Sequence, residues 1–234
     1  MKNSSKKDIL KSLCKKNKWD FSLFEKYVNL IEEKNKVMNL TGFSGERLWE
    51  EGIWESLIFM LQIVKDRNGL NILDIGAGAG FPSIPYALTK PKNKIFIYEP
   101  LQKRVLFLEL VVNELNLNNY VEIKRTRVEE VKDKNLFDIV TARAVSSVRG
   151  LLMSSFHLVK LNGEMSLLKS KKVYEEIEEA QPILKLIDHS INIEEFQEDF
   201  STREDKIVII KKLRSTPPMF PFEWKEIKKV EKIK

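Results

Sequence analysis

The sequence has few of the residues that build disulfides and metal centres. Its 234 residues include one cysteine, Cys14, and two histidines, His157 and His189. One cysteine cannot form an internal disulfide or a thiolate cluster, and two histidines add little metal-binding capacity. We therefore expect neither a structural disulfide nor a bound metal.

Long apolar runs are missing as well. No run approaches the roughly 20 apolar residues that cross a bilayer, and residues 1–8 lack the apolar core and cleavage site of a secretory signal. We expect a cytoplasmic protein without a membrane span. The length suits one α/β domain with short extensions, and we expect a monomer.

The charge is moderately basic and unevenly distributed. Forty lysines and arginines face 34 acidic residues, which gives a net charge of +6 and a pI near 9.1. Lysines crowd the first 18 residues and return in 211–214 and 225–234, whereas 175–205 is acidic. The excess fits a nucleic-acid partner, since basic faces attract phosphates, but it equally fits solvated surfaces.

Hydrophobic periodicity divides the chain into three parts. Helical spacing dominates residues 1–65, which we interpret as an N-terminal helical extension. From 66 to 214, short apolar runs alternate with helical segments. This alternation predicts an α/β fold with a mostly parallel, Rossmann-like sheet. A proline-containing break at 216–221 precedes a basic tail, residues 215–234, whose apolar residues recur every three positions from Trp224. That spacing predicts a short amphipathic helix that either docks on the body or binds RNA.

We expect strands at 71–75, 94–99, 121–124, 137–142, 164–169, 191–196 and 206–211, with helices at 82–88 and 101–115. The last two strands are expected to pair antiparallel at one edge of the sheet.

A glycine-rich loop follows the first of these strands. Asp74 ends the strand, and Gly76, Gly78 and Gly80 follow at alternate positions. Glycine permits positive φ and close backbone approach to a ligand, while Asp74 can accept hydrogen bonds from loop amides or an ammonium group. Because the first strand-to-helix turn of such a sheet lies nearest the cofactor, we predict a cofactor loop here. A plain connecting turn is the alternative.

The spacing of the loop indicates which adenosine cofactor it holds. Three positions after Gly78 comes Phe81, not the glycine of the dinucleotide fingerprint, which argues against a nicotinamide enzyme. Glu99 ends the next strand, 23 positions after Gly76, where its carboxylate can accept both ribose hydroxyls. S-adenosylmethionine has a ribose and no pyrophosphate. The sequence therefore predicts an S-adenosylmethionine-dependent methyltransferase.

Further segments resemble one family of methyltransferases. The cofactor loop continues as Gly80-Phe81-Pro82-Ser83-Ile84-Pro85, and Arg127-Val128-Glu129 and Arg143-Ala144 follow in order. Together with Asn39-Leu40-Thr41 and Lys103-Arg104-Val105, these segments resemble the bacterial 16S rRNA guanine-N7 methyltransferases, the glucose-inhibited division protein B family. The resemblance covers about residues 24–214.

The resemblance implies a seven-stranded methyltransferase fold and transfer of a methyl group from S-adenosylmethionine to guanine N7 in 16S rRNA of the small ribosomal subunit. It places cofactor contacts on Gly76, Phe81, Val128, Glu129 and Arg143. Arg143 ends a strand beside the transfer zone and is the candidate catalytic residue, with a structural ion pair as the alternative. Lys169 and Arg203 are candidate substrate contacts; Lys169 is alternatively a solvated strand end.

Some positions differ from the family pattern. Gly52 stands where many members have histidine, Ser83 replaces a usual glycine, and Ala142 replaces a usual serine. Guanine N7 has its own lone pair, so no general base is needed, and Cys14 lies far from any strand end that could present a nucleophile. Two alternatives stay open: a methyltransferase of the same fold acting on another base or a small molecule, and a non-catalytic cofactor-binding ribosome-assembly factor.

Overall fold

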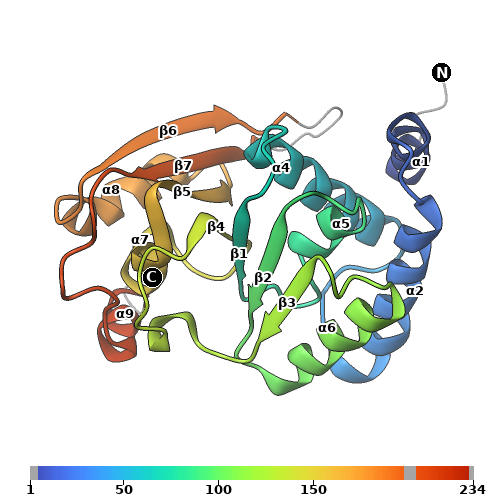
Figure 1. The fold of residues 1–234 in the computed structure, drawn as a ribbon, viewed down its shortest axis with the longest axis horizontal. Coiled ribbons are helices and arrows are strands. Elements are labelled where there is room, and N and C mark those ends of the chain that lie inside the picture. The colour runs from blue at the N-terminus through green and yellow to red at the C-terminus, as the bar shows by residue number, and fades with distance from the viewer. Residues whose placement is uncertain (1–4, 198–203, 232–234) are drawn as a thin grey trace. The chain divides into compact units, whose positions relative to one another are not determined.

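A computed structural model describes residues 5–197 and 204–231. The described residues contribute seven strands to a sheet of order β3-β2-β1-β4-β5-β7-β6 (Figure 1). Pairings β1–β4, β4–β5 and β2–β3 are parallel, whereas β7 pairs antiparallel with both β5 and β6. The predicted fold class and the antiparallel edge are therefore confirmed. The strands are β1 (Asn71–Ile75), β2 (Lys94–Tyr98), β3 (Val121–Lys124), β4 (Phe137–Ala142), β5 (Val159–Lys169), β6 (His189–Glu195) and β7 (Lys206–Lys212).

The chain divides into two compact units, and the first combines residues 1–69 with 77–125. Its N-terminal helices form where the apolar spacing predicted them, and the buried face of α2 carries Phe24, Tyr27, Val28 and Ile31. Asp20 caps this helix by accepting a hydrogen bond from the Ser22 amide. Helices of this unit are α1 (Lys6–Asn17), α2 (Phe21–Met38), α3 (Gly45–Arg47), the π-helical η1 (Leu48–Trp54), α4 (Glu55–Val64), α5 (Ser83–Ala87) and α6 (Gln102–Glu114).

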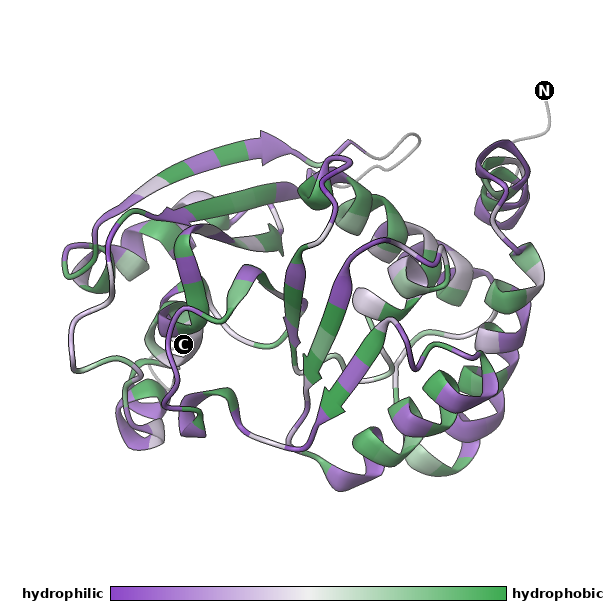
Figure 2. Cartoon of the chain, viewed as in Figure 1, coloured by the Kyte–Doolittle hydropathy of each residue, from purple (hydrophilic) through white to green (hydrophobic). Residues whose placement is uncertain are grey.

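The second unit combines residues 70–76 with 126–234 and contains β1 and β4–β7. Figure 2 shows β6 with alternating hydrophilic and hydrophobic residues, as an edge strand with one solvated face requires. β5 begins five residues earlier than predicted, since Val159 already pairs with Phe137 before a register shift. The helices are η2 (Val128–Glu130), α7 (Val148–Ser155), η3 (Phe156–Leu158), α8 (Val173–Leu184) and α9 (Trp224–Glu231).

A buried lysine ties β7 to η3 in the second unit. The Lys212 side chain is completely buried, and its ammonium donates to Oδ1 of Asn135 and to the carbonyl oxygens of Phe156, His157 and Val159 at 2.8–3.3 Å. Burial lowers its pKa to about 8. The ammonium thus gives the carbonyl groups at the turn into β5 a further donor, since the Asn135 amide already donates to the His157 carbonyl oxygen and the Val159 amide to that of Phe156.

The C-terminal segment docks on its own unit, one of the two outcomes that its spacing left open. Helix α9 packs on α7 and buries Ile227, and the Phe222 amide donates to the Met153 carbonyl oxygen at 3.0 Å. Ile233, the last residue of the predicted apolar series, lies outside the described residues. Across the described ranges, no helix is long and apolar enough to cross a membrane, and no cluster of three metal-ligating side chains occurs. The predicted boundaries at 65 and 214 stay predictions.

Candidate active site

The glycine-rich loop passes from one compact unit to the other between Gly76 and Ala77. On the β1 side, Asp74 is completely buried and pairs in register with Thr141 of β4. Gly76 has a φ of +66°, and a methyl group at this position would lie 3.0 Å from Cγ2 of Val145. The backbone conformation and Val145 together explain glycine at position 76.

On the other side, the loop is hydrogen-bonded to Glu99. The sequence predicted one cofactor site for the glycine loop and Glu99. The Gly78 amide donates to Oε2 of Glu99 at 3.2 Å, and the Leu101 amide donates to Oε1 at 3.0 Å. The carboxylate is fully buried, and the Arg104 guanidinium lies 3.8 Å from Oε2. Gly78 itself has a φ of +61° with open space where a side chain would begin. The loop therefore leaves room for a ligand beside a fixed carboxylate.

Gly80 has a different role in the loop. A methyl group there would lie 2.5 Å from Cγ1 of Ile84 and 2.7 Å from Oη of Tyr27, and its φ is +106°. The Tyr27 hydroxyl, buried on α2, donates to the Ala79 carbonyl oxygen at 2.6 Å. Gly80 thus permits close packing of the loop against α2 and α5. Its predicted contact with cofactor stays a prediction.

Phe81 lies in an aromatic cluster, 8% exposed. Its ring centre is 6.2 Å from both Tyr27 and Phe43, edge-on to the former. Gly52 of η1 makes room for the ring, since a methyl group at Gly52 would lie 2.9 Å from Cζ of Phe81. Phe81 is therefore packed as a core residue at the end of the loop.

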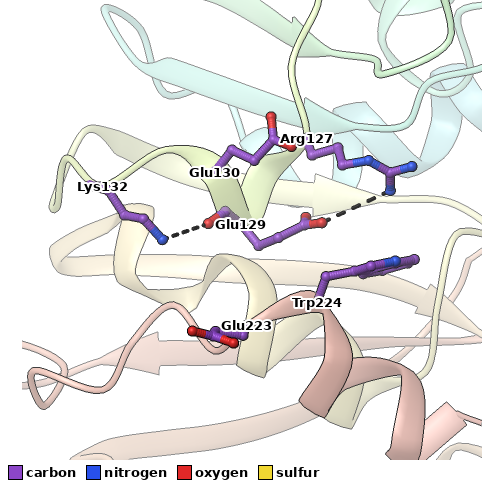
Figure 3. A pocket seen from close by; sticks show the side chains of 6 residues that line it. All are labelled: Arg127, Glu129, Glu130, Lys132, Glu223 and Trp224. Carbon is purple, nitrogen blue, oxygen red and sulfur yellow. Dashed lines mark hydrogen bonds and ion pairs between the residues drawn. The ribbon is translucent and has the colours of Figure 1, made fainter.

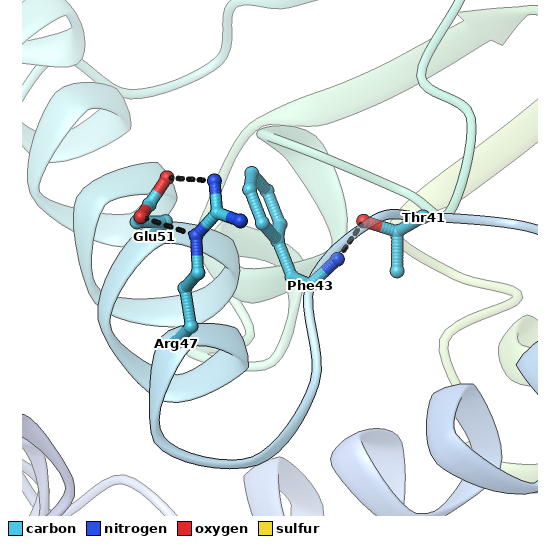
Figure 4. Close-up of polar contacts among 4 residues, drawn as sticks. All are labelled: Thr41, Phe43, Arg47 and Glu51. Carbon is cyan, nitrogen blue, oxygen red and sulfur yellow. Dashed lines mark hydrogen bonds and ion pairs between the residues drawn. The ribbon is translucent and has the colours of Figure 1, made fainter.

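The outer side of the cluster is polar (Figure 4). The Arg47 guanidinium lies 5.0 Å from the ring centre of Phe43 and forms two hydrogen bonds to the Glu51 carboxylate, at 2.7 and 3.3 Å. The Phe43 amide donates to Oγ1 of Thr41, part of the Asn39-Leu40-Thr41 segment. Arg47 is well exposed, so this edge offers an aromatic face and a cation to solvent.

Arg143 directly follows β4, as predicted, and its loop is held by an ion pair. Lys169, at the end of β5, lies with its ammonium 2.9 Å from the Glu176 carboxylate and donates to the Ser146 carbonyl oxygen. Glu176 also accepts the Val148 amide at 3.0 Å. The pair thus fixes both sides of the turn that follows Arg143. Lys169 is 12% exposed, so it is not a solvated strand end.

Val128 and Glu129 begin the short helix η2, beside a pocket of about 430 Å³. Glu129 is 91% buried, and within the described chain its Oε1 has no hydrogen bond, although Arg127 lies 4.0 Å away. Figure 3 shows this carboxylate beside Arg127 and the ring of Trp224. The guanidinium of Arg127 lies 5.0 Å from that ring centre. A buried carboxylate oxygen beside an aromatic ring suits an amino group on a planar base.

The geometry thus brings together Gly78 with Glu99 in the first unit, and Gly76 with the turn after Arg143 in the second. Sequence reasoning missed Tyr27, Glu176 and the partners of Phe81, because each contact joins segments remote in the sequence. A buried tyrosine needs a hydrogen-bond acceptor, which was the only available signal for Tyr27. Arg203 lies outside the described residues.

Comparison with known proteins agrees with this geometry. The model of the family "rRNA small subunit methyltransferase G" matches residues 20–202. The chain belongs to this family. A Mesomycoplasma hyopneumoniae protein named ribosomal RNA small subunit methyltransferase G is 44% identical over 69% of this chain and 81% of its own. The protein of that name from Carboxydothermus hydrogenoformans is 36% identical over 85% and 86%.

Solved structures support the fold. A Thermotoga maritima structure described as an S-adenosylmethionine-dependent O-methyltransferase superposes with a TM-score of 0.54 at 16% identity, covering 80% of this chain and 72% of that one. The predicted resemblance is confirmed by the family match, and with it the enzyme class. The chain is therefore an S-adenosylmethionine-dependent rRNA methyltransferase.

Proposed function

We propose that the protein transfers the methyl group of S-adenosylmethionine to N7 of a guanine in 16S rRNA. The observation that best supports this reading is the Gly78–Glu99 pair, because it combines open space at a positive-φ glycine with a buried, positioned carboxylate. Membership of the rRNA methyltransferase G family points to the RNA substrate. We further infer a monomer that acts in the cytoplasm, where small subunits are assembled.

The residues present fit the cofactor. We propose that Glu99 accepts the ribose hydroxyls and that Glu129, whose Oε1 has no hydrogen bond within the described residues, accepts the adenine amino group. We propose that the backbone at Gly78, where the space is open, approaches the cofactor closely. Val128, Asp74 and Gly76 are proposed as further contacts. Phe81 and Gly80 are proposed to hold the loop in its conformation, since both are packed against Tyr27.

S-adenosylmethionine supplies an electrophilic methyl group on a sulfonium. The N7 lone pair of guanine forms the new bond to carbon, the carbon–sulfur bond breaks, and its electron pair stays on sulfur. No proton moves, so the protein needs only to orient the base and exclude water. We propose that Arg143 performs this orientation at the end of β4, and that Lys169 and Glu176 position its turn. Arg203 is proposed as an RNA contact.

Methyl transfer from labelled S-adenosylmethionine tests the assignment. Unmethylated small subunits and naked 16S rRNA are offered separately, and modified nucleotides are mapped. We expect label at a guanine that becomes sensitive to N7-specific chain cleavage. Label on another base or on a metabolite would support the same-fold alternative. Cofactor binding without transfer to either RNA would support a non-catalytic assembly factor.

The role of Arg143 is tested by comparing Arg143→Ala and Arg143→Lys. If Arg143 orients the base, Arg143→Ala lowers kcat strongly while the Kd for cofactor stays near that of the wild type. A large rise in that Kd would instead make Arg143 a cofactor contact. Arg143→Lys, which keeps the charge without the planar fork, separates charge from geometry.

A further inference from the structure

The positive charge of this protein is concentrated at its N-terminus. Residues 1–18 contain seven of the 40 basic residues and one of the 34 acidic residues, a local net charge of +6. The remaining 216 residues hold 33 of each sign and are neutral as a whole. The basic excess is therefore not spread over solvated faces. Six of these seven lysines lie on α1 or at its C-cap, and Figure 2 shows α1 as largely hydrophilic.

Four of these lysines form a line along α1. Lys7, Lys11, Lys15 and Lys18 are spaced by four, four and three residues, so they lie on one side of the helix and its C-cap. With a rise of about 1.5 Å per residue, successive members stand about 4.5–6 Å apart along the axis. We call these four residues the lysine stripe. Its spacing is close to the separation of successive phosphates along a nucleic-acid strand.

Contacts within the first unit anchor one end of the lysine stripe. The ammonium of Lys7 lies 4.9 Å from the ring centre of Trp49, and that of Lys11 lies 5.9 Å from the ring centre of Phe21. These two rings stack on each other at 5.9 Å. The aromatic pair thus positions both ammonium groups at the surface; Lys7 is also ion-paired with Glu25, whereas Lys11 forms no ion pair within the described residues.

The other end of the lysine stripe is open. Lys15 and Lys18 are exposed, and neither side chain has an ion pair or hydrogen bond within the described chain. The acidic groups nearby are occupied: Glu25 pairs with Lys7 at 2.9 Å, Asp8 accepts from Ser5, and Asp20 accepts from Ser22. Asp8 and Asp20 keep their negative charge in these bonds, but residues 1–20 still carry a net charge of +5, so a polyanion meets a positive surface along the stripe.

Helix α1 does not depend on these lysines for its own stability. Leu10 and Cys14 are buried beneath it, Ser5 caps its N-terminus, and the helix packs on α2 and η1. Burial raises the pKa of the Cys14 thiol to about 11, so position 14 is an inert core residue. Lys15 and Lys18 are therefore positive charges that the packing of the helix does not use.

We propose that the lysine stripe binds the phosphate backbone of the RNA substrate without reading its sequence. The partner is RNA because the lysines form a line at phosphate spacing with aromatic side chains beside them, and because the proposed function supplies an RNA. η1, against which α1 packs, also contributes Gly52 beside Phe81, so the stripe belongs to the unit that carries the cofactor loop.

Salt-dependent RNA binding by the full chain tests the proposal. The triple variant Lys11→Gln, Lys15→Gln, Lys18→Gln keeps helix propensity and removes three charges. A matched control, Lys36→Gln, Lys94→Gln, Lys185→Gln, removes three exposed charges elsewhere. Binding to a 16S rRNA fragment and to an unrelated RNA is measured between about 50 and 200 mM salt. Circular dichroism and Tm check that both variants fold like the wild type.

We expect the slope of log K against log salt to become shallower by about 2 in the stripe variant, for both RNAs, since each lost phosphate contact removes about 0.7–0.9. The control should keep the wild-type slope. KM for RNA should rise in the stripe variant, with kcat at saturating RNA and the Kd for S-adenosylmethionine unchanged. Equal slopes in the stripe variant and the control would overturn the proposal.

A second arm separates RNA from an anionic membrane. If phosphatidylserine vesicles bind through the lysine stripe while RNA binding is unaffected by the triple variant, the proposal fails and a membrane is the partner. The proposed function is tested separately, and it fails if the wild-type protein transfers no methyl group to rRNA. The two failures are distinguishable, because the salt dependence of RNA binding is measured without methyl transfer.

Discussion

Removal of the Tyr27 hydroxyl is the most direct test of how the cofactor loop is held. Tyr27 is completely buried, and its hydroxyl donates to the Ala79 carbonyl oxygen at 2.6 Å. In Tyr27→Phe that carbonyl group loses its buried donor, which costs about 1–3 kcal/mol. A loss of about 2 kcal/mol lowers the Tm of a chain this long by roughly 4–8 °C.

The same change should weaken cofactor binding. Without the hydroxyl, the Ala79 peptide can rotate, and the adjacent Gly78 amide no longer meets the Glu99 carboxylate in one fixed geometry. Thermal unfolding gives the stability, and calorimetric titration with S-adenosylmethionine well below the Tm gives the Kd. Tyr174→Phe is the matched control, because Tyr174 lies on α8 and is 60% exposed.

Three results are distinguishable. A lower Tm together with a higher Kd supports the view that the Tyr27 hydroxyl holds the cofactor loop in its binding conformation. A lower Tm with an unchanged Kd means that Tyr27 stabilises the core but does not position the loop. If Tyr27→Phe matches Tyr174→Phe in both measurements, the hydrogen bond contributes nothing and the reasoning is refuted.

Three further predictions concern the loop and the buried polar groups. Gly78→Ala should raise the Kd for cofactor, and the positive φ of this residue should cost about 1–2 kcal/mol in stability. Gly80→Ala should cost more stability, because its methyl group would lie 2.5 Å from Ile84. Equal Tm values for the two variants would contradict this order. Burial lowers the His157 pKa from 6.5 to about 4, so the unfolded chain binds the proton first and stability falls as pH drops from about 6.5 to 4. His157→Gln should remove up to about 3 kcal/mol of that fall, seen as a flatter urea-unfolding profile; parallel wild-type and variant profiles would count against it. Lys212→Met should lose at least about 2 kcal/mol, because it removes a buried donor that serves Oδ1 of Asn135 and three carbonyl oxygens. The loss is measured as a lower urea midpoint, and Lys211→Met, at an exposed position, should not show it.

Local patterns predicted most of the sheet. The apolar runs at 121–124 and 137–142 became β3 and β4 without a change of bounds, since short runs flanked by polar residues fix both ends of a strand. The start of β5 was not predicted, because Asn162 and Gly163 interrupt the apolar run and the register shifts there. The π-helical geometry of η1 has no comparable sequence signal.

For the site residues, too, local patterns predicted some positions, whereas contacts between remote segments were not predicted. Gly78 and Glu99 were predicted to contact one cofactor, because the ends of neighbouring parallel strands meet at one edge of the sheet. The structure adds a hydrogen bond that joins the two residues to each other. The contact between Tyr27 and Ala79 spans 52 residues, and no local pattern records it. Lys169 was predicted from its place at a strand end, yet its ion pair with Glu176 of α8 depends on packing.

The fit between Gly52 and Phe81 has an evolutionary consequence. Any side chain at position 52 would overlap both the Phe81 ring and Cδ1 of Leu48, which would lie 2.8 Å from its first carbon. A lineage with glycine here can therefore regain a larger residue only after position 48 or 81 has changed. We expect these positions to vary together among relatives, and a histidine introduced at position 52 alone to be poorly tolerated.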